Sequence, residues 1–216
     1  MSTRVLLIRH GDTQASQDGR FAGAIDIPLS KEGRIHASEL AVRLSRYPLD
    51  AIYASSMQRT RETAGFTAHV HGLEVIPVPE FREINHGIWD GKNREEILAQ
   101  YGQAMLDDYN RDPFHFRPEN GESAEDVLKR AAPKLSELVK KHDGQTILIV
   151  AHKTTNRLLI CNFVGLDPAQ YRDKLAQRPA CLNVLTFPND HEAQLLLLND
   201  IGHYAMSDDL QYEYVV

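Results

Sequence analysis

Short apolar runs alternate with longer stretches of helical periodicity along most of this chain. Val5–Ile8 and Thr146–Ala151 consist almost wholly of apolar residues, a pattern typical of strands that are covered on both faces. Similar runs predict further strands at Ala51–Ala54, Glu74–Val78, Cys181–Phe187 and Ala193–Leu198. The stretches with helical periodicity lie at Leu29–Tyr47, Met57–His69, Ser123–His142 and Thr155–Val164.

This alternation predicts an α/β fold. Strands joined by helices form parallel pairs, and the connecting helices cover both faces of the sheet. We therefore expect a three-layer sandwich with a mostly parallel central sheet and helices on both faces. Ser30, at the beginning of the first helical stretch, is the predicted N-cap of that helix.

Length and composition restrict the classes of protein to consider. A chain of 216 residues fits a single domain over 1–216, and its net charge of -6 argues against a general nucleic-acid partner. The first apolar run is too short for a signal peptide, and no stretch approaches the roughly 20 apolar residues of a membrane span. Cys161 and Cys181 form no CxxC pair, so we expect reduced core thiols in a cytoplasmic protein.

Histidine, arginine and glutamate side chains follow the ends of separate predicted strands. Arg9 and His10 follow the first strand, Arg59 the second, Glu83 the third and His152 the fourth. In open α/β sheets, ligands bind outside the carboxyl ends of the strands. We therefore expect these five side chains to meet at one edge of the sheet, where they serve chemistry and not folding.

This set of side chains suits phosphoryl transfer. Converging arginines repel each other unless an anion lies between them, and their planar forks match phosphate oxygens. Backbone N–H groups at the helix starts after Arg59 and after His152 are expected to add to this anion site. A neutral imidazole can attack phosphorus, a second histidine can donate to phosphoryl oxygens, and a carboxyl group can protonate the leaving alkoxide. These roles predict a phosphohistidine intermediate.

The segment Arg9–Thr13 (RHGDT) resembles the RHG signature of the histidine phosphatase superfamily, also called the phosphoglycerate-mutase-like family. Further segments are similar to that family's motifs and occur in the family's order, so that the resemblance covers nearly the whole chain. These segments are Gly19–Gly33, Ser55–Ala64, Phe81–Gly91, Glu119–Ser123 and Val150–Leu159.

The resemblance implies a role for each of the residues at the strand ends. It implies that His10 is the nucleophile, that Arg9, Arg59 and His152 bind the phosphoryl group, and that Glu83 is the proton donor. It also implies a metal-independent phosphoric monoester hydrolase, similar to histidine acid phosphatases, that needs no cofactor. Because members of the family are often dimers, a homodimer is an expectation from the resemblance alone.

Several other positions are candidate substrate contacts. Ser16 stands where the family commonly has Asn, and Lys153 stands where it usually has Gly directly after the second histidine. An ammonium group at Lys153 suits a carboxylate or a second anionic group on the substrate. The remaining candidates lie after the signature, in the acid motif and after the last predicted strand: Phe21, Ala22, Gly23, His86 and His203.

The favoured function is a phosphomonoesterase that acts on small-molecule phosphate esters, but three alternatives stay open. A phosphoglycerate-type mutase needs a more basic lid than the lid-like insertion expected around 91–121, whose charges are mixed. A metal hydrolase using His10, Asp12, Glu83 and His152 is disfavoured because the arginines repel a cation and no HxH or HExxH spacing occurs. A non-catalytic phospho-ligand module is disfavoured because every catalytic group of the motifs is retained.

Overall fold

A computed structural model describes residues 1–204 of the chain. These residues form a six-stranded sheet with the strand order β3-β2-β4-β1-β5-β6. The strands are β1 (Thr3–Arg9), β2 (Ala51–Ser55), β3 (Val75–Val78), β4 (Thr146–Ala151), β5 (Leu182–Phe187) and β6 (Gln194–Asp200). The pairings among β1 to β4 are parallel, whereas β5 runs antiparallel to both β1 and β6. The predicted mostly parallel sheet is confirmed.

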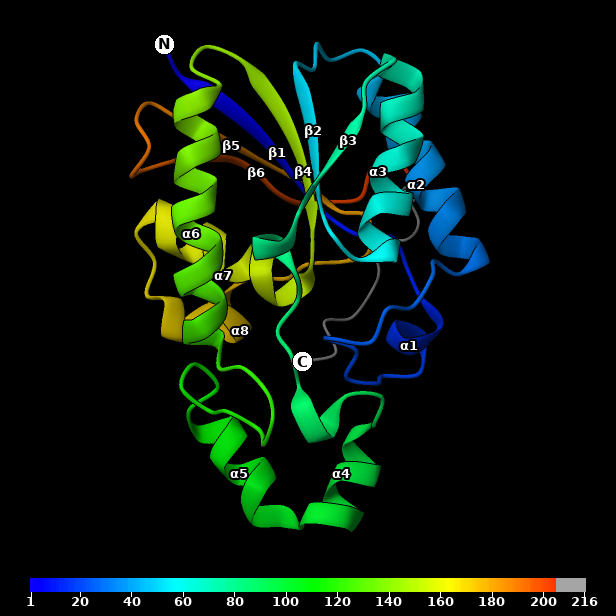
Figure 1. Cartoon of the computed structure of the whole chain (residues 1–216), viewed down its shortest axis with the longest axis vertical. Helices are drawn as coiled ribbons and strands as arrows, with labels where there is room; N and C mark the ends of the chain where they lie inside the picture. The colour runs from blue at the N-terminus through cyan, green and yellow to red at the C-terminus, as the bar shows by residue number, and fades with distance from the viewer. Residues whose placement is uncertain (205–216) are drawn as a thin grey trace.

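Helices cover both faces of this sheet, as the apolar strands require (Figure 1). On one face, Leu6 and Ile8 of β1 share a buried cluster with side chains of α2 (Lys31–Leu44) and α3 (Gln58–His71). On the other face, Val5 and Leu7 share a buried cluster with side chains of α6 (Ala124–Lys141) and α7 (Lys153–Val164). Because successive side chains of a strand point to opposite faces, one apolar run serves both layers.

The predicted elements are present with boundaries that differ by a few residues. Ser30 caps α2 as predicted, since its side chain accepts a hydrogen bond of 3.0 Å from the Gly33 N–H. Helix α7 begins at Lys153, two residues before the predicted start at Thr155, so that His152 directly precedes its first turn. Cys161 and Cys181 are buried and unpaired, as expected.

Two helices beyond the sheet edge were not predicted. α4 (Arg94–Tyr101) and α5 (Gln103–Arg111) lie at the lower end of the molecule in Figure 1, past the ends of β1 and β4. They pack around Trp89, Ile97 and Leu106, a cluster separate from the two cores on the sheet. The short helices are α1 (Gln14–Gln17) and α8 (Tyr171–Lys174), with 3-10 turns at Pro79–Phe81, Gly87–Trp89 and Pro168–Gln170.

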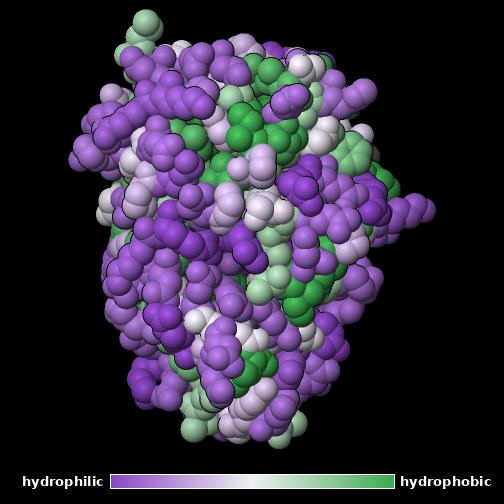
Figure 2. All heavy atoms as spheres, viewed as in Figure 1, coloured by the Kyte–Doolittle hydropathy of each residue, from purple (hydrophilic) through white to green (hydrophobic). Residues whose placement is uncertain are grey.

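The surface is mostly hydrophilic on the face that Figure 2 shows. A green apolar area interrupts it in the upper half of that view. No helix within residues 1–204 is long and apolar enough to cross a membrane.

Candidate active site

The end of β1 carries Arg9 and His10 into a pocket at the carboxyl edge of the sheet. The chain can turn there because Gly11 packs directly against the start of α2. A Cβ atom at Gly11 would lie 2.6 Å from the carbonyl oxygen of Gly33, closer than any side chain can approach. The glycine of the RHG segment therefore allows the close contact that aims His10 at the pocket.

His10 is oriented as a nucleophile by a single backbone contact. Its Nδ1 lies 2.7 Å from the Gly11 carbonyl oxygen, which can only accept a hydrogen bond, so Nδ1 carries the proton. The lone pair of the neutral ring is then on Nε2, the nitrogen left for the pocket. Burial, together with the charges of Arg59 and Arg9, holds the pKa of His10 well below 6.5. The imidazole is therefore neutral at neutral pH, as attack by Nε2 requires.

Arg9 and Arg59 both line the pocket beside His10. Arg59 donates to the carbonyl oxygens of Ala22, Gly23 and Ile25 at 2.9–3.1 Å, which fixes its direction. Arg9 donates one hydrogen bond of 2.7 Å to a backbone carbonyl, and its buried Nε has no partner. Burial lowers the pKa of both guanidinium groups. Arg9 therefore has more N–H groups free to bind an anion than Arg59 has.

His152 is fully buried behind His10 and does not itself line the pocket. The two rings meet edge to face with centroids 5.1 Å apart. Arg59 Nε donates to His152 Nδ1 at 3.3 Å, which assigns the ring proton to Nε2, 2.9 Å from Ser55 Oγ. In this arrangement both ring nitrogens have protein partners, and His152 reaches the pocket through Arg59.

Glu83 lies at the N-terminus of α7, and this corrects one expectation from the sequence. Its two carboxyl oxygens accept from the backbone N–H groups of Thr154 and Thr155 at 3.1 and 3.3 Å. These two amides, expected to bind the phosphoryl group, therefore hold the Glu83 carboxyl group, for which a helix N-terminus is favourable. At the start of α3, the Gln58 N–H likewise donates to Asp26 and not into the pocket.

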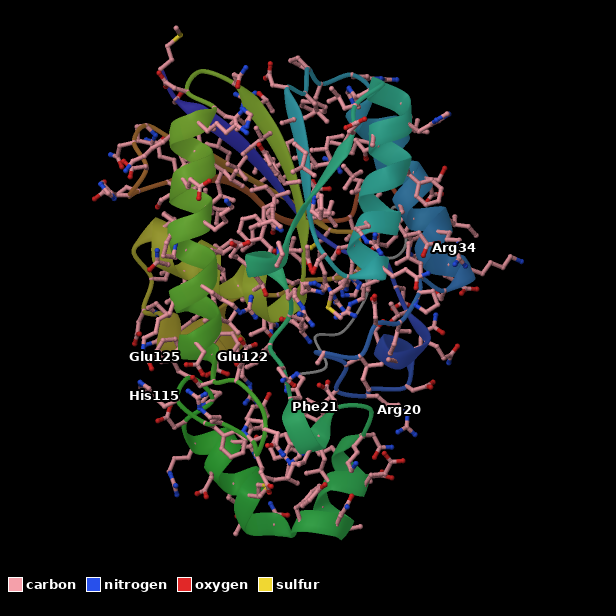
Figure 3. All side chains as sticks on the ribbon, in the orientation of Figure 1. Arg20, Phe21, Arg34, His115, Glu122 and Glu125 are labelled. Carbon is pink, nitrogen blue, oxygen red and sulfur yellow. The ribbon has the colours of Figure 1, made fainter. Side chains whose placement is uncertain are left out.

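The loop that carries Glu83 is held in place by Arg130 of α6. Its guanidinium group donates to the carbonyl oxygens of Glu80, Arg82 and Glu83 at 2.6–3.1 Å. The same group pairs with Glu122, which in turn accepts from the backbone N–H of Asn85. Figure 3 shows Glu122 at the lower end of α6, near this loop. Arg130 and Glu122 therefore position Glu83, the predicted proton donor, and neither lines the pocket.

Replacing Arg130 with methionine is expected to lower kcat by about 10- to 100-fold, because a small misplacement of a catalytic group is enough for such a loss. The loss should be larger for alkyl phosphates than for an aryl phosphate with an activated leaving group, since the displaced group is the proton donor. Steady-state kinetics on both ester types, compared with the Lys129→Met variant of an exposed α6 residue, measure this difference. Equal losses on both esters would show that Arg130 acts on stability alone.

The pocket has a volume of about 370 Å³ and contains most of the predicted contacts. All of the catalytic residues predicted from the strand ends except His152 line it, and five of the seven candidate substrate contacts do so as well. These five are Ser16, Phe21, Ala22, His86 and Lys153. Their role as substrate contacts stays a prediction.

Phe21 and His86 form one wall of the pocket. Their rings meet edge to face with centroids 4.9 Å apart, and burial lowers the pKa of His86. Figure 3 shows Phe21 and Arg20 on the chain segment that follows α1 and leads to α2. This segment is tied to the start of the 91–121 region, because the Phe21 N–H donates to the Lys92 carbonyl oxygen at 2.9 Å.

Gly23 and His203 are not among the pocket-lining residues. The Gly23 N–H donates to Asp90 at 2.6 Å, and a Cβ atom at this position would lie 1.8 Å from the Ile84 carbonyl oxygen. Gly23 therefore joins the loop after the signature to the acid loop by close packing. His203 is half-buried after β6, where burial and Arg43 lower its pKa to about 4. The geometry gives no support to its predicted contact with the substrate.

Sequence reasoning missed several residues of the site. Ser55 is the last residue of β2, and only its contact with His152 reveals its role. Arg157 lies four residues after Lys153 on α7, a spacing that places both on one helix face and could have been noticed. Four further missed lining residues come from the helices at the lower end and from α8: Arg94, Tyr109, Tyr171 and Arg172.

Within the part of the chain that the structure describes, no group of three or more histidine, cysteine or carboxylate side chains could hold a metal ion. The charges beside His10 and His152 also disfavour a metal ion, because two guanidinium groups adjoin these histidines. Such cations favour an anion in the pocket.

Comparison with known proteins identifies the family to which this arrangement belongs. Residues 5–201 match the model of the histidine phosphatase superfamily, branch 1. Phosphoserine phosphatase 1 of Hydrogenobacter thermophilus is 34% identical over 171 residues, which cover 78% of this chain and 79% of the relative. A 2,3-bisphosphoglycerate-dependent phosphoglycerate mutase of Bartonella henselae is 31% identical over 174 residues, which cover 77% and 84%.

A solved structure shows the same fold. Bacillus stearothermophilus YhfR is similar to this chain with a TM-score of 0.86 and 28% sequence identity, over 93% of this chain and 98% of that one. The family match includes the RHG segment that carries His10 and continues through the strand ends that carry Arg59, Glu83 and His152. The chain belongs to the histidine phosphatase superfamily.

Proposed function

We propose that this protein is a metal-independent phosphomonoesterase that hydrolyses small-molecule phosphate esters through a phosphohistidine at His10. One observation carries the proposal: the neutral His10 ring, with its proton on Nδ1, shares a pocket with two guanidinium groups and a carboxyl group. A nucleophile, anion-binding groups and a proton donor are the parts that phosphoryl transfer to and from an imidazole needs.

The first step forms the covalent intermediate. The lone pair of His10 Nε2 attacks phosphorus, and an N–P bond forms as the P–O bond to the leaving alcohol breaks. Glu83 gives its proton to the leaving oxygen. Arg9 and Arg59 stabilise the charge that develops on the phosphoryl oxygens, and His152 supports them through the hydrogen bond that its Nδ1 accepts from Arg59 Nε.

The second step returns the enzyme to its starting state. The Glu83 carboxylate, now unprotonated, takes a proton from a water molecule that attacks phosphorus. The N–P bond breaks, its electron pair returns to His10 Nε2, and inorganic phosphate leaves. The two backbone N–H groups of α7 hold the same carboxyl group in place for both steps.

The charges on the 91–121 segment favour hydrolysis of a phosphate ester over the reaction of a phosphoglycerate-type mutase. Arg111 pairs with Asp108, and Arg117 pairs with Asp126. Only Arg94 of this segment's basic residues lines the pocket. We propose that the segment acts as a lid-like cover within one domain and contributes only Arg94 to the cations of the pocket.

Turnover of at least one simple phosphomonoester is expected to survive EDTA, with less than about a twofold change in rate, because the guanidinium groups already supply the positive charge of a metal ion. Release of inorganic phosphate from a panel of small esters, with and without EDTA, measures this. Vanadate should inhibit in both conditions as a mimic of five-coordinate phosphorus. Activity that is lost with EDTA and restored only by a divalent cation would overturn the metal-independent mechanism.

A further inference from the structure

The pocket contains more positive charge than a phosphoryl group requires. Besides Arg9 and Arg59, four cationic side chains line it, and we call them the second cation cluster: Arg94 of α4, Lys153 and Arg157 of α7, and Arg172 of α8. A fifth basic residue, Arg20, also lines the pocket but pairs with Glu96. Three separate helices thus bring the cluster to one wall of the pocket.

The members of this cluster are close enough to repel one another. Desolvation at the pocket, together with the charges of Arg157, Arg9 and Arg172, lowers the pKa of Lys153 to about 8. Arg172 lies over the Tyr109 ring, with its guanidinium carbon 4.4 Å from the ring centroid, and its Nη1 donates to the Tyr109 carbonyl oxygen at 3.3 Å. The ring thus holds Arg172 at the pocket despite the like charges nearby.

No carboxylate within residues 1–204 forms an ion pair with the cluster. Among residues 1–204, Glu83 is the only acidic residue that lines the pocket, and backbone N–H groups of α7 hold it. Arg157 Nε is buried without a hydrogen-bond partner. A buried charged donor without a partner is costly, so the site favours a ligand that supplies an acceptor.

The position of Glu83 shows which part of a substrate would meet the cluster. A proton donor must lie on the side of the leaving alcohol, and Glu83 is bound by the first turn of the helix that carries Lys153 and Arg157. The charge of Glu83 also acts on the pKa of both cations. Lys153 and Arg157 therefore lie on the side of Glu83, where the leaving alcohol is expected.

We propose that the second cation cluster binds a second anionic group, a carboxylate or a second phosphate, on the alcohol portion of the substrate. The preferred substrates are therefore phosphomonoesters that carry two anionic groups. This proposal rests on the proposed function, since it assigns the phosphoryl group to His10 and Arg9. Tyr109 and Tyr171 add hydroxyl donors at the same wall, and burial raises the pKa of both, which keeps them protonated.

The test compares matched esters that differ only in the second charge. One pair is 3-phosphoglycerate and glycerol 3-phosphate, and the other is the bisphosphate and the monophosphate of 1,3-propanediol. We expect kcat/KM of the wild-type protein to be at least about tenfold higher for the doubly anionic member of one pair, mainly through KM, since a charge-assisted hydrogen bond is gained. The pair that shows this ratio distinguishes a carboxylate from a phosphate.

Arg157→Gln and Lys153→Gln should each reduce that ratio by about tenfold or more. The matched control is Lys174→Gln, an exposed residue of α8 that does not line the pocket and should keep the wild-type ratio. Thermal unfolding should show no loss of stability in Arg157→Gln, because removing one of several like charges relieves repulsion.

The outcomes separate the two proposals. Turnover of the singly charged esters by wild-type protein, with no preference for the second anion or with a ratio that Arg157→Gln leaves unchanged, would overturn the second anion site and leave the proposed function intact. Failure to hydrolyse any of the four esters, together with no trapped phosphoenzyme, would overturn the proposed function itself.

Discussion

Replacing His10 with alanine is expected to reduce turnover of phosphate esters by about 10⁴-fold or more, because without the nucleophile neither step of the reaction has a covalent path. Wild-type protein mixed briefly with ³²P-labelled ester and quenched should retain label that survives base and is lost in acid, as a phosphohistidine is. The variant should retain none. Intensity of the labelled band after denaturing electrophoresis measures this.

The control for this experiment is His69→Ala, which removes an exposed histidine of α3 outside the pocket. Its labelling and turnover should equal those of the wild-type protein. Circular dichroism of His10→Ala should show the wild-type helix and strand content, since the substitution removes a ring at the pocket and not an apolar core group. Label that persists in His10→Ala would show that another residue forms the intermediate.

Glu83→Gln is expected to produce the second large effect, and the effect should depend on the leaving group. For an alkyl phosphate, kcat/KM should fall by about 10²- to 10⁴-fold, the usual contribution of general acid catalysis. For p-nitrophenyl phosphate the loss should be below about tenfold, because this leaving group needs little protonation. A plot of log kcat/KM against leaving-group pKa measures this, and its slope should be steeper for the variant.

Glu80→Gln is the matched control, since it neutralises a carboxyl group on the same loop that does not line the pocket. Its slope should equal that of the wild-type protein. Equal slopes of log kcat/KM against leaving-group pKa for Glu83→Gln and the wild-type protein would assign the proton transfer to another residue. Comparison of these slopes with the Arg130→Met result distinguishes the loss of the Glu83 carboxylic acid from a displacement of Glu83.

The central sheet could be predicted from local sequence alone. Val5–Ile8 and Thr146–Ala151 are so uniformly apolar that both faces must be covered, and β1 and β4 are indeed adjacent, parallel and buried. The positions of His10 and His152 follow from the same pattern, because parallel strands end at one edge of a sheet. Helices α4 and α5 escaped prediction because Ile97 and Leu106 are their only buried residues, and both depend on Trp89 for a core.

The sequence by itself determined the family, and it predicted which polar residues follow the strands and which groups react, because each depends on short segments that are local in the chain. Only the tertiary structure decided which partner each group meets. The amides of α7 hold Glu83 in place of a phosphate, and Ser55 contacts His152 across two strands. The closeness of Arg157 and Arg172 to Lys153 likewise depends on how α7 and α8 pack. The interaction between charges depends on the distance between them, and a local sequence pattern does not give the distance between residues of separate helices.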